Sequence, residues 1–270
     1  MSLHPFPMEK EMNPFSQGFN FRTGRFLPAL VLLAAGIPVI AQQAVSAPLS
    51  ADEVMRHVAQ MNDQRANALE TYTSIRSYHL ECHCISHKTA DMVVRADYEG
   101  PNKKVFTIVS ESGSGSVRSR VFKKLLDAEQ ESMREENQER TAITPQNYTF
   151  ELSDYQKIDG NELYVIEARP LHKNKFLFRG RLWVDAKAFA ITQIQGEPAV
   201  NPSWWTVKTD FKRNYQEIGN FWLPESNESE TKVRIFGTAV LTIKYGEYQI
   251  TEAHNSNTAL AVEEKPTNGQ

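Results

Sequence analysis

This chain has few cysteines and no excess of positive charge, and each of these two features excludes a class of protein. The 270 residues include only two cysteines, so the fold cannot depend on a framework of disulfide bonds. Aspartate and glutamate outnumber lysine and arginine, 33 to 30, which argues against nucleic acid as a partner. Hydrophobic residues make up 40% of the chain, and a chain of this length can bury a stable core without disulfide bonds.

Signatures of several common enzyme classes are also missing. There is no Gly-x-Ser-x-Gly elbow and no His-Glu-x-x-His zinc motif. Gly113-Ser114-Gly115 lacks the further residues of a phosphate-binding loop, which favours a hinge or a helix cap. We therefore predict no catalytic residue, no cofactor and no enzymatic activity, although a Ser/His/Asp triad assembled only in the fold stays open.

The N-terminal region has the layout of a secretory signal peptide. Arg22 and Arg25 precede an apolar run, and small-residue cleavage patterns end at Ala41 and Ala47. Pro48 disfavours the second site, so we expect cleavage after Ala41. A retained membrane anchor is the alternative, but a spanning helix needs roughly 20 apolar residues and this run is shorter.

The chain is accordingly expected to have three parts. Residues 1–41 form a leader and signal peptide, residues 42–252 form one domain, and residues 253–270 form a flexible polar tail. Without its signal peptide, the protein should be a soluble periplasmic monomer.

Hydrophobic periodicity predicts the elements of the domain. Ser50 and Glu53 form the pattern of a capping box, which predicts a helix ending near Leu69. Three strands should follow, then a second helix over residues 117–139, then about seven strands from residue 148 onward. This order favours an α+β fold, a curved antiparallel sheet forming a half-open β-barrel with helices as a lid on its concave face. A tightly packed core without a hollow is the alternative.

One predicted strand carries both cysteines. Cys82 and Cys84 share its apolar face, and we expect two buried thiols, because residues two apart on a strand are poorly placed for a disulfide bond. The opposite face carries a chemically reasonable set of zinc or copper ligands, namely His79, Glu81, His83 and His87. Histidines are also common on solvated strands, so no metal is predicted.

Aromatic side chains are dense in the C-terminal half of the chain. Core packing explains such a density, and so does the lining of a lipid-sized cavity. If the cavity exists, the inner face of the sheet and the apolar stripe of the second helix should line it. The candidate ligand-binding residues are Val121, Leu125, Phe150, Phe176, Phe178, Leu182, Trp205, Val207, Phe211 and Tyr215.

Several short motifs give the chain a family resemblance across residues 50–250. The most specific are Trp183-Val184-Asp185, Phe221-Trp222-Leu223-Pro224 and Ile235-Phe236-Gly237, with a Gly100-Pro101 turn before them. With these motifs the sequence resembles the LolA-like superfamily, the periplasmic carriers that sort lipoproteins to the outer membrane. The branch it looks most like is labelled outer membrane lipoprotein-sorting protein.

The resemblance implies a half-barrel lidded by helices around an apolar cavity for acyl chains. The ligand would be a lipoprotein or another acylated molecule, and partner proteins in the inner and outer membranes would load and unload it. Two other functions stay open: an envelope hydrolase with a polar cleft, and a structural or docking module that binds no ligand.

Overall fold

The computed structural model describes residues 48–85, 87–100, 103–158, 160–201, 206–235 and 237–253. All of these residues belong to one unit of the chain, Ala47–Gln270. The predicted leader and nearly all of the predicted tail lie outside the described residues.

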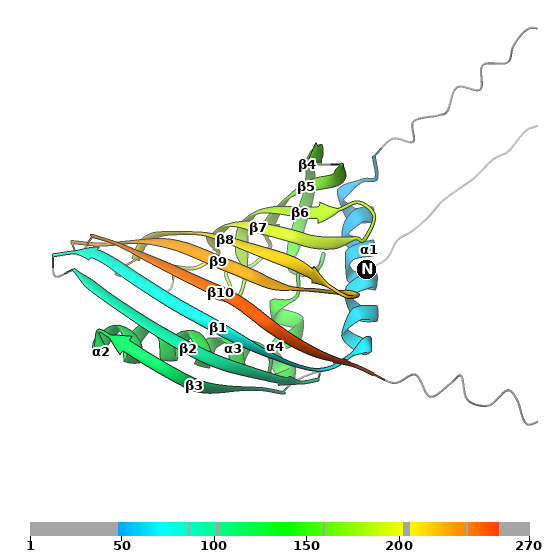
Figure 1. The fold of residues 1–270 in the computed structure, drawn as a ribbon. Helices are drawn as coiled ribbons and strands as arrows, with labels where there is room; N and C mark the ends of the chain where they lie inside the picture. Colours follow the sequence, from blue (N-terminus) through cyan, green and yellow to red (C-terminus); the bar gives the residue numbers. More distant parts are fainter. Residues whose placement is uncertain are drawn as a thin grey trace, which may run out of the picture. The chain divides into compact units, whose positions relative to one another are not determined.

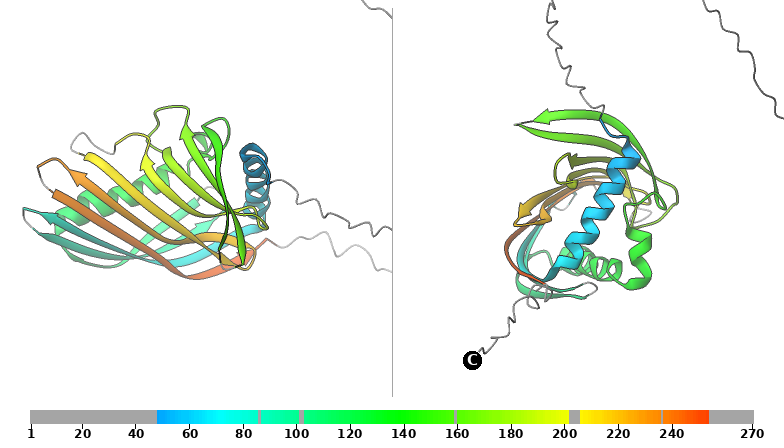
Figure 2. Two further views of the ribbon diagram at one scale, coloured as in Figure 1. Left: turned by 90° about the horizontal axis from the view of Figure 1, so that it is seen from above. Right: turned by 90° about the vertical axis from the view of Figure 1, so that its right-hand side faces the viewer.

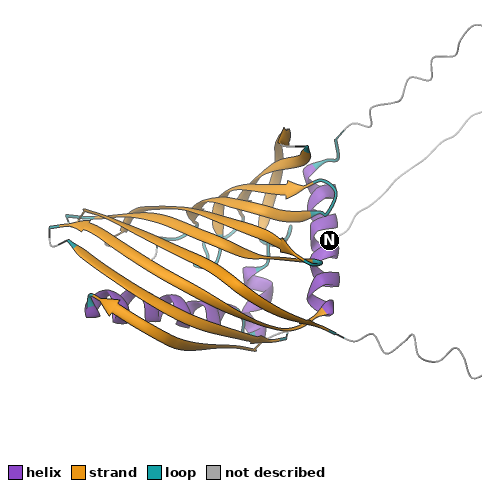
Figure 3. Ribbon diagram, in the orientation of Figure 1, coloured by secondary structure: helices purple, strands orange, loops and turns teal. Residues whose placement is uncertain are grey.

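Ten strands form a single antiparallel sheet (Figures 1 and 3). Its spatial order is β3-β2-β1-β10-β9-β8-β7-β6-β5-β4. The strands are β1 (Leu69–Cys84), β2 (Lys88–Glu99), β3 (Lys103–Gly113), β4 (Tyr148–Ile158), β5 (Asn161–Pro170), β6 (Phe178–Asp185), β7 (Ala190–Pro198), β8 (Thr206–Ile218), β9 (Phe221–Val233) and β10 (Gly237–Glu252).

The strand order confirms the predicted antiparallel sheet and shows how it is assembled. Strands β1 to β3 form one meander and β4 to β10 form another, and the two join where β1 pairs with β10. The edges of the sheet are therefore β3 and β4, which do not pair, so the sheet stays open. Since β3 and β4 are consecutive in the chain, the helical segment between them must pass from one edge to the other.

The described residues form five helical pieces: α1 (Ala51–Ala68), α2 (Gly115–Val117), the π-helical turn η1 (Arg118–Phe122), α3 (Lys123–Ser132) and α4 (Glu135–Thr141). The capping box of α1 is confirmed: the Glu53 amide donates to Ser50 Oγ at 3.3 Å, and the Ser50 amide donates to the Glu53 carboxylate at 3.0 Å. The helix ends one residue before the predicted Leu69.

The predicted second helix, residues 117–139, is not continuous. It contains a π turn, and it breaks before α4, where Arg134 is extended. The Glu131 carbonyl at this break accepts from the Asn137 side chain at 2.8 Å and from the Arg134 amide at 3.3 Å, so both groups cap the end of α3. The apolar stripe ends with Leu126, so beyond it packing no longer holds the chain in one helix.

Two apolar clusters hold the helices against the sheet. Helix α1 packs with the β4–β7 half through Val54, Met55 and Val58. The segment from α2 to α3 packs with β1, β2 and β10 through Val117, Phe122 and Leu126. Figure 2 shows the curve of the sheet that separates these two halves.

A pair of glycines lets β6 and β7 approach closely. Gly180 is paired with Gly196 across the two strands. A Cβ added at Gly180 would lie 2.1 Å from the Gln195 carbonyl oxygen, and one at Gly196 would lie 2.2 Å from that of Arg179. Only glycine fits both positions, because any side chain there would collide with the backbone of the neighbouring strand.

Candidate ligand-binding site

The structure divides the predicted ligand-binding residues between the two apolar clusters. Phe178 and Leu182 are buried in the cluster around α1, and Phe150, Phe211 and Tyr215 pack against it. The helix residues Val121 and Leu125 are half-buried beside the other cluster. Trp205 lies outside the described residues. The predicted residues therefore form two groups rather than one lining.

Val207 does not share the inner face of β8. The pairing of β8 with β9 is shifted between Thr206 and Lys208, and Val207 is 53% exposed. A β-bulge changes which way the following side chains point, so simple alternation from Phe211 back to Val207 fails here.

A cavity of about 310 Å³ adjoins the first group of residues. Its aromatic lining comes from Tyr148, Phe176, Phe178, Phe211 and Tyr215, and its volume is within the range of ligand pockets, roughly 300–1,000 Å³. The Phe178 amide donates to the Tyr148 hydroxyl at 3.2 Å, and burial raises the pKa of Tyr148 to about 12. This side chain is therefore neutral at physiological pH.

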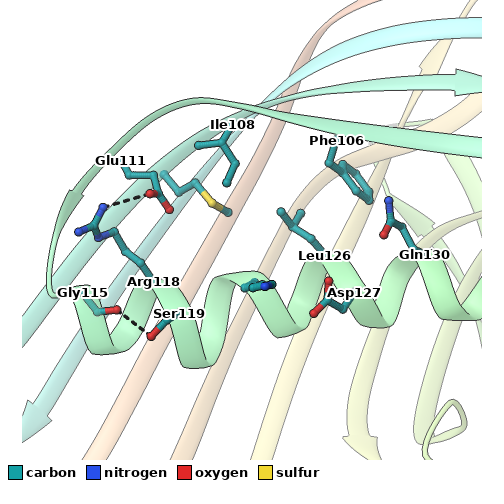
Figure 4. Close-up of a pocket in the computed structure, with 11 residues that line it drawn as sticks. Phe106, Ile108, Glu111, Gly115, Arg118, Ser119, Leu126, Asp127 and Gln130 are labelled. Carbon is teal, nitrogen blue, oxygen red and sulfur yellow. Dashed lines mark hydrogen bonds and ion pairs between the residues drawn. The ribbon is translucent and has the colours of Figure 1, made fainter.

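A second cavity, of about 560 Å³, lies between β2–β3 and the helical segment (Figure 4). Met92, Phe106 and Leu126 form its apolar wall. The lining also includes an ion pair of 3.0 Å between Arg118 and Glu111. Arg118 begins the π turn, a feature that is frequent at functional sites.

Between the two apolar clusters lies a group of buried charges that the sequence analysis did not predict. Arg76 of β1 is only 1% exposed, and its Nη1 lies 2.8 Å from Oε2 of Glu129 on α3. Lys104 of β3 is 11% exposed, and its Nζ lies 2.7 Å from Oε1 of the same carboxylate. One carboxylate on the helical segment thus binds two cations from two strands.

Aromatic rings surround these charges. The Arg76 guanidinium lies 4.9 Å from the ring centroid of Tyr245 and 5.3 Å from that of Phe106. Burial by itself would raise the pKa of Glu129, but Lys104 and Arg76 outweigh it and hold that pKa below its usual value. Glu129 is therefore ionised at neutral pH.

A third cation extends the group across the sheet. Arg213 of β8 lines the smaller cavity, and burial raises the pKa of Tyr245 although the nearby positive charges of Arg213 and Arg76 oppose that rise. Asn227 of β9 is paired with Arg213 and with Ile243, which is paired in turn with Tyr78 of β1. We call Arg76, Lys104, Glu129 and Arg213, with Tyr245 between them, the cationic seam.

The sequence did contain a signal for the cationic seam. Arg76 stands between Ser74 and Tyr78, and Arg213 stands between Phe211 and Tyr215, at positions that alternation assigns to the inner face. A charged residue at an inward position of a half-buried strand is unusual, because an unpaired buried charge is costly. This anomaly identifies both arginines as candidate functional residues.

The hairpin end of β1 and β2 holds the predicted histidine face. Glu81, His83 and His87 place one ligand atom each within 4.8 Å of one another, and both histidines are exposed. His79 is paired instead with Asp91, at 2.7 Å. Cys82 is disulfide-bonded, which corrects the prediction of two thiols. The pairing of β1 with β2 ends at Cys82, whereas its pairing with β10 continues to Cys84, so beyond Cys82 the strand is held on one side only.

The described part of the chain contains no helix that is both long and apolar enough to span a membrane.

Residues 85–249 match a protein family described as a family of unknown function, DUF5686. The chain belongs to this family. In this DUF5686 chain the matched segment begins just after β1 and ends within β10, so it includes Lys104, Glu129, Arg213 and Tyr245 but not Arg76. No curated protein matches the sequence.

Three solved structures are similar to this one at low sequence identity. A LolA superfamily protein from Nitrosomonas europaea has a TM-score of 0.36 and 12% identity over 77% of this chain and 96% of its own. An outer membrane lipoprotein-sorting protein domain from Vibrio parahaemolyticus has a TM-score of 0.38 and 10% identity, covering 76% and 96%. A DUF1329 family protein from Desulfovibrio piger has a TM-score of 0.38 and 10% identity, covering 74% and 92%.

Two of these three structures carry the names of the superfamily and of the branch that the sequence motifs resemble.

Proposed function

We propose that this protein is a periplasmic binding protein that holds the acyl chains of a lipoprotein or another acylated ligand. It would act as a carrier rather than an enzyme. Its helices would serve as a lid on the concave face of the sheet, and membrane proteins would load and unload it.

The observation that carries the proposal is the aromatic cavity beside β8. It lies on the inner face of an open sheet, and its apolar lining is drawn from strands far apart in sequence, with Tyr148 on β4 and Phe211 on β8. Each CH₂ of an acyl chain moved from water into such a lining gains about 0.8 kcal/mol. A cavity of this kind therefore suits an aliphatic chain better than a polar substrate.

The route of the chain from β3 to β4 supports the idea of a lid. This segment connects the two unpaired edges of the sheet, and most of its polar residues are exposed. A few apolar side chains, chiefly Val117, Phe122 and Leu126, and the ion pairs of Glu129 hold this segment to the sheet. An element with so few buried contacts opens at a lower free energy than the sheet beneath it.

The test uses full-length protein exported to a bacterial periplasm and purified from there. Native mass spectrometry should detect bound acyl lipid or lipopeptide, and diphenylhexatriene, an uncharged apolar probe, should bind to the delipidated protein. Phe211→Lys should weaken probe binding at least about tenfold, because it places an unpaired charge against the probe.

Val207→Lys is the matched control, since it adds the same charge to the same strand at an exposed position. It should bind the probe as the native protein does, and circular dichroism melts should show both variants folded. A native protein that neither retains lipid nor binds the probe would refute the proposal.

A further inference from the structure

The interior of the cationic seam holds more positive than negative charge. Arg76, Lys104 and Arg213 contribute three cations, and Glu129 is the only carboxylate that ion-pairs with any of them among the described residues. The neighbouring hydroxyls cannot supply the missing negative charge, because burial raises the pKa of Tyr245 and of Tyr78.

Two guanidinium groups of the cationic seam also keep a donor unused. The Nε atoms of Arg76 and Arg213 are buried and have no hydrogen-bond partner among the described residues. A buried donor without a hydrogen-bond partner destabilises the folded protein, and more so when it is charged. The protein therefore carries donors and charge that an anion would satisfy.

The position of the cationic seam relates it to the aromatic cavity. Arg213 and Asn227 lie in the lining of that cavity together with Phe178 and Phe211. A ligand whose chain occupies the aromatic part would bring its polar end to the arginine. From there the strand pairing leads across β9 and β10 to Tyr78, two residues from Arg76 on β1, three strands or about 14 Å along the sheet.

We propose that the ligand is an amphiphile with an anionic head, a carboxylate or a phosphate, and that the cationic seam binds this head while the cavity beside β8 holds the chain. This inference rests on the proposed function and specifies its ligand. Arg213 would bind the head directly, and Arg76, fixed by Glu129, would add a second positive charge.

The test compares palmitic acid with cetyl alcohol, which share a chain length and differ in the charge of the head. Each ligand displaces diphenylhexatriene from the delipidated full-length protein. The acid should bind at least about tenfold more tightly than the alcohol, since hydrogen bonds to charged groups are the strong ones. Arg213→Gln should reduce that ratio several-fold.

Lys212→Gln is the matched control, because it removes an equal charge from the adjacent, exposed position of β8 and should keep the ratio. If the native protein binds the acid and the alcohol with equal affinity, the proposal of an anionic head is refuted and the proposal of acyl-chain binding stands. Binding of neither ligand would overturn both. Inorganic phosphate, tested by thermal shift, separates the sources: stabilisation by phosphate alone, lost in Arg213→Gln, would assign the seam to a free anion rather than a lipid head.

Discussion

Replacing Glu129 with glutamine is expected to lower the free energy of unfolding by about 3–5 kcal/mol, which is the usual cost of breaking a buried ion pair by removing one partner. The substitution leaves Arg76, 1% exposed, and Lys104, 11% exposed, without their shared carboxylate. Equilibrium unfolding in urea measures the difference. Glu131→Gln is the control, because its partner Lys175 is 60% exposed, and such surface pairs contribute less than about 1 kcal/mol.

The same substitution should change the response to acid. The pKa of Glu129 is lower in the folded protein than in the unfolded chain, where it is about 4.3. Its contribution is therefore complete above that value and is lost as the pH falls through the lower, folded pKa. Arg76 and Lys104 stay charged throughout this range. Native protein and Glu129→Gln should differ most near neutral pH and converge in acid. A difference that does not shrink would contradict the account of the ion pairs.

Replacing Phe122 with alanine should cost about 3–5 kcal/mol as well, through the loss of a buried aromatic ring and the cavity it leaves. Phe122 is fully buried, and its ring centroid lies 5.8 Å from that of Tyr78 on β1. It is the largest buried side chain with which the helical segment contacts the sheet.

The same variant also tests the lid. In Phe122→Ala, hydrogen exchange should become faster in α3 before it changes in the central strands, because the segment can detach without the sheet unfolding. Val121→Ala, at the neighbouring half-buried position, should cost about 1 kcal/mol and leave that order unchanged. Equal acceleration in the segment and in β1 would show that the two unfold together.

The fold could be predicted to the extent that it depends on local patterns. The Ser50 capping box and the strand alternation depend on neighbours in sequence, and the structure confirms both. The bulge beside Val207 depends on how β8 pairs with β9, and periodicity could not reveal it. The break at Arg134 follows the end of the apolar stripe at Leu126, beyond which the predicted helix was extended too far.

The candidate site was predicted only in its apolar part. Phe178, Phe211 and Tyr215 were identified because aromatic residues on one face of a strand suggest a lining. The ion pairs of Arg76 were not, because Glu129 is 53 residues away and belongs to a helix whose charges suggested only a solvated surface. The pairing depends on the segment returning across the sheet, which follows from the strand order and not from the sequence of either partner.

The most direct test of the central claim is the crystal structure of the protein bound to a fatty acid that carries bromine at the end of its chain, with the bromine located by anomalous diffraction. The account predicts a bromine peak in the aromatic cavity beside Phe178 and Phe211, with the carboxylate toward Arg213. A bromine found only on the outer surface, with that cavity closed by its own side chains, would contradict it.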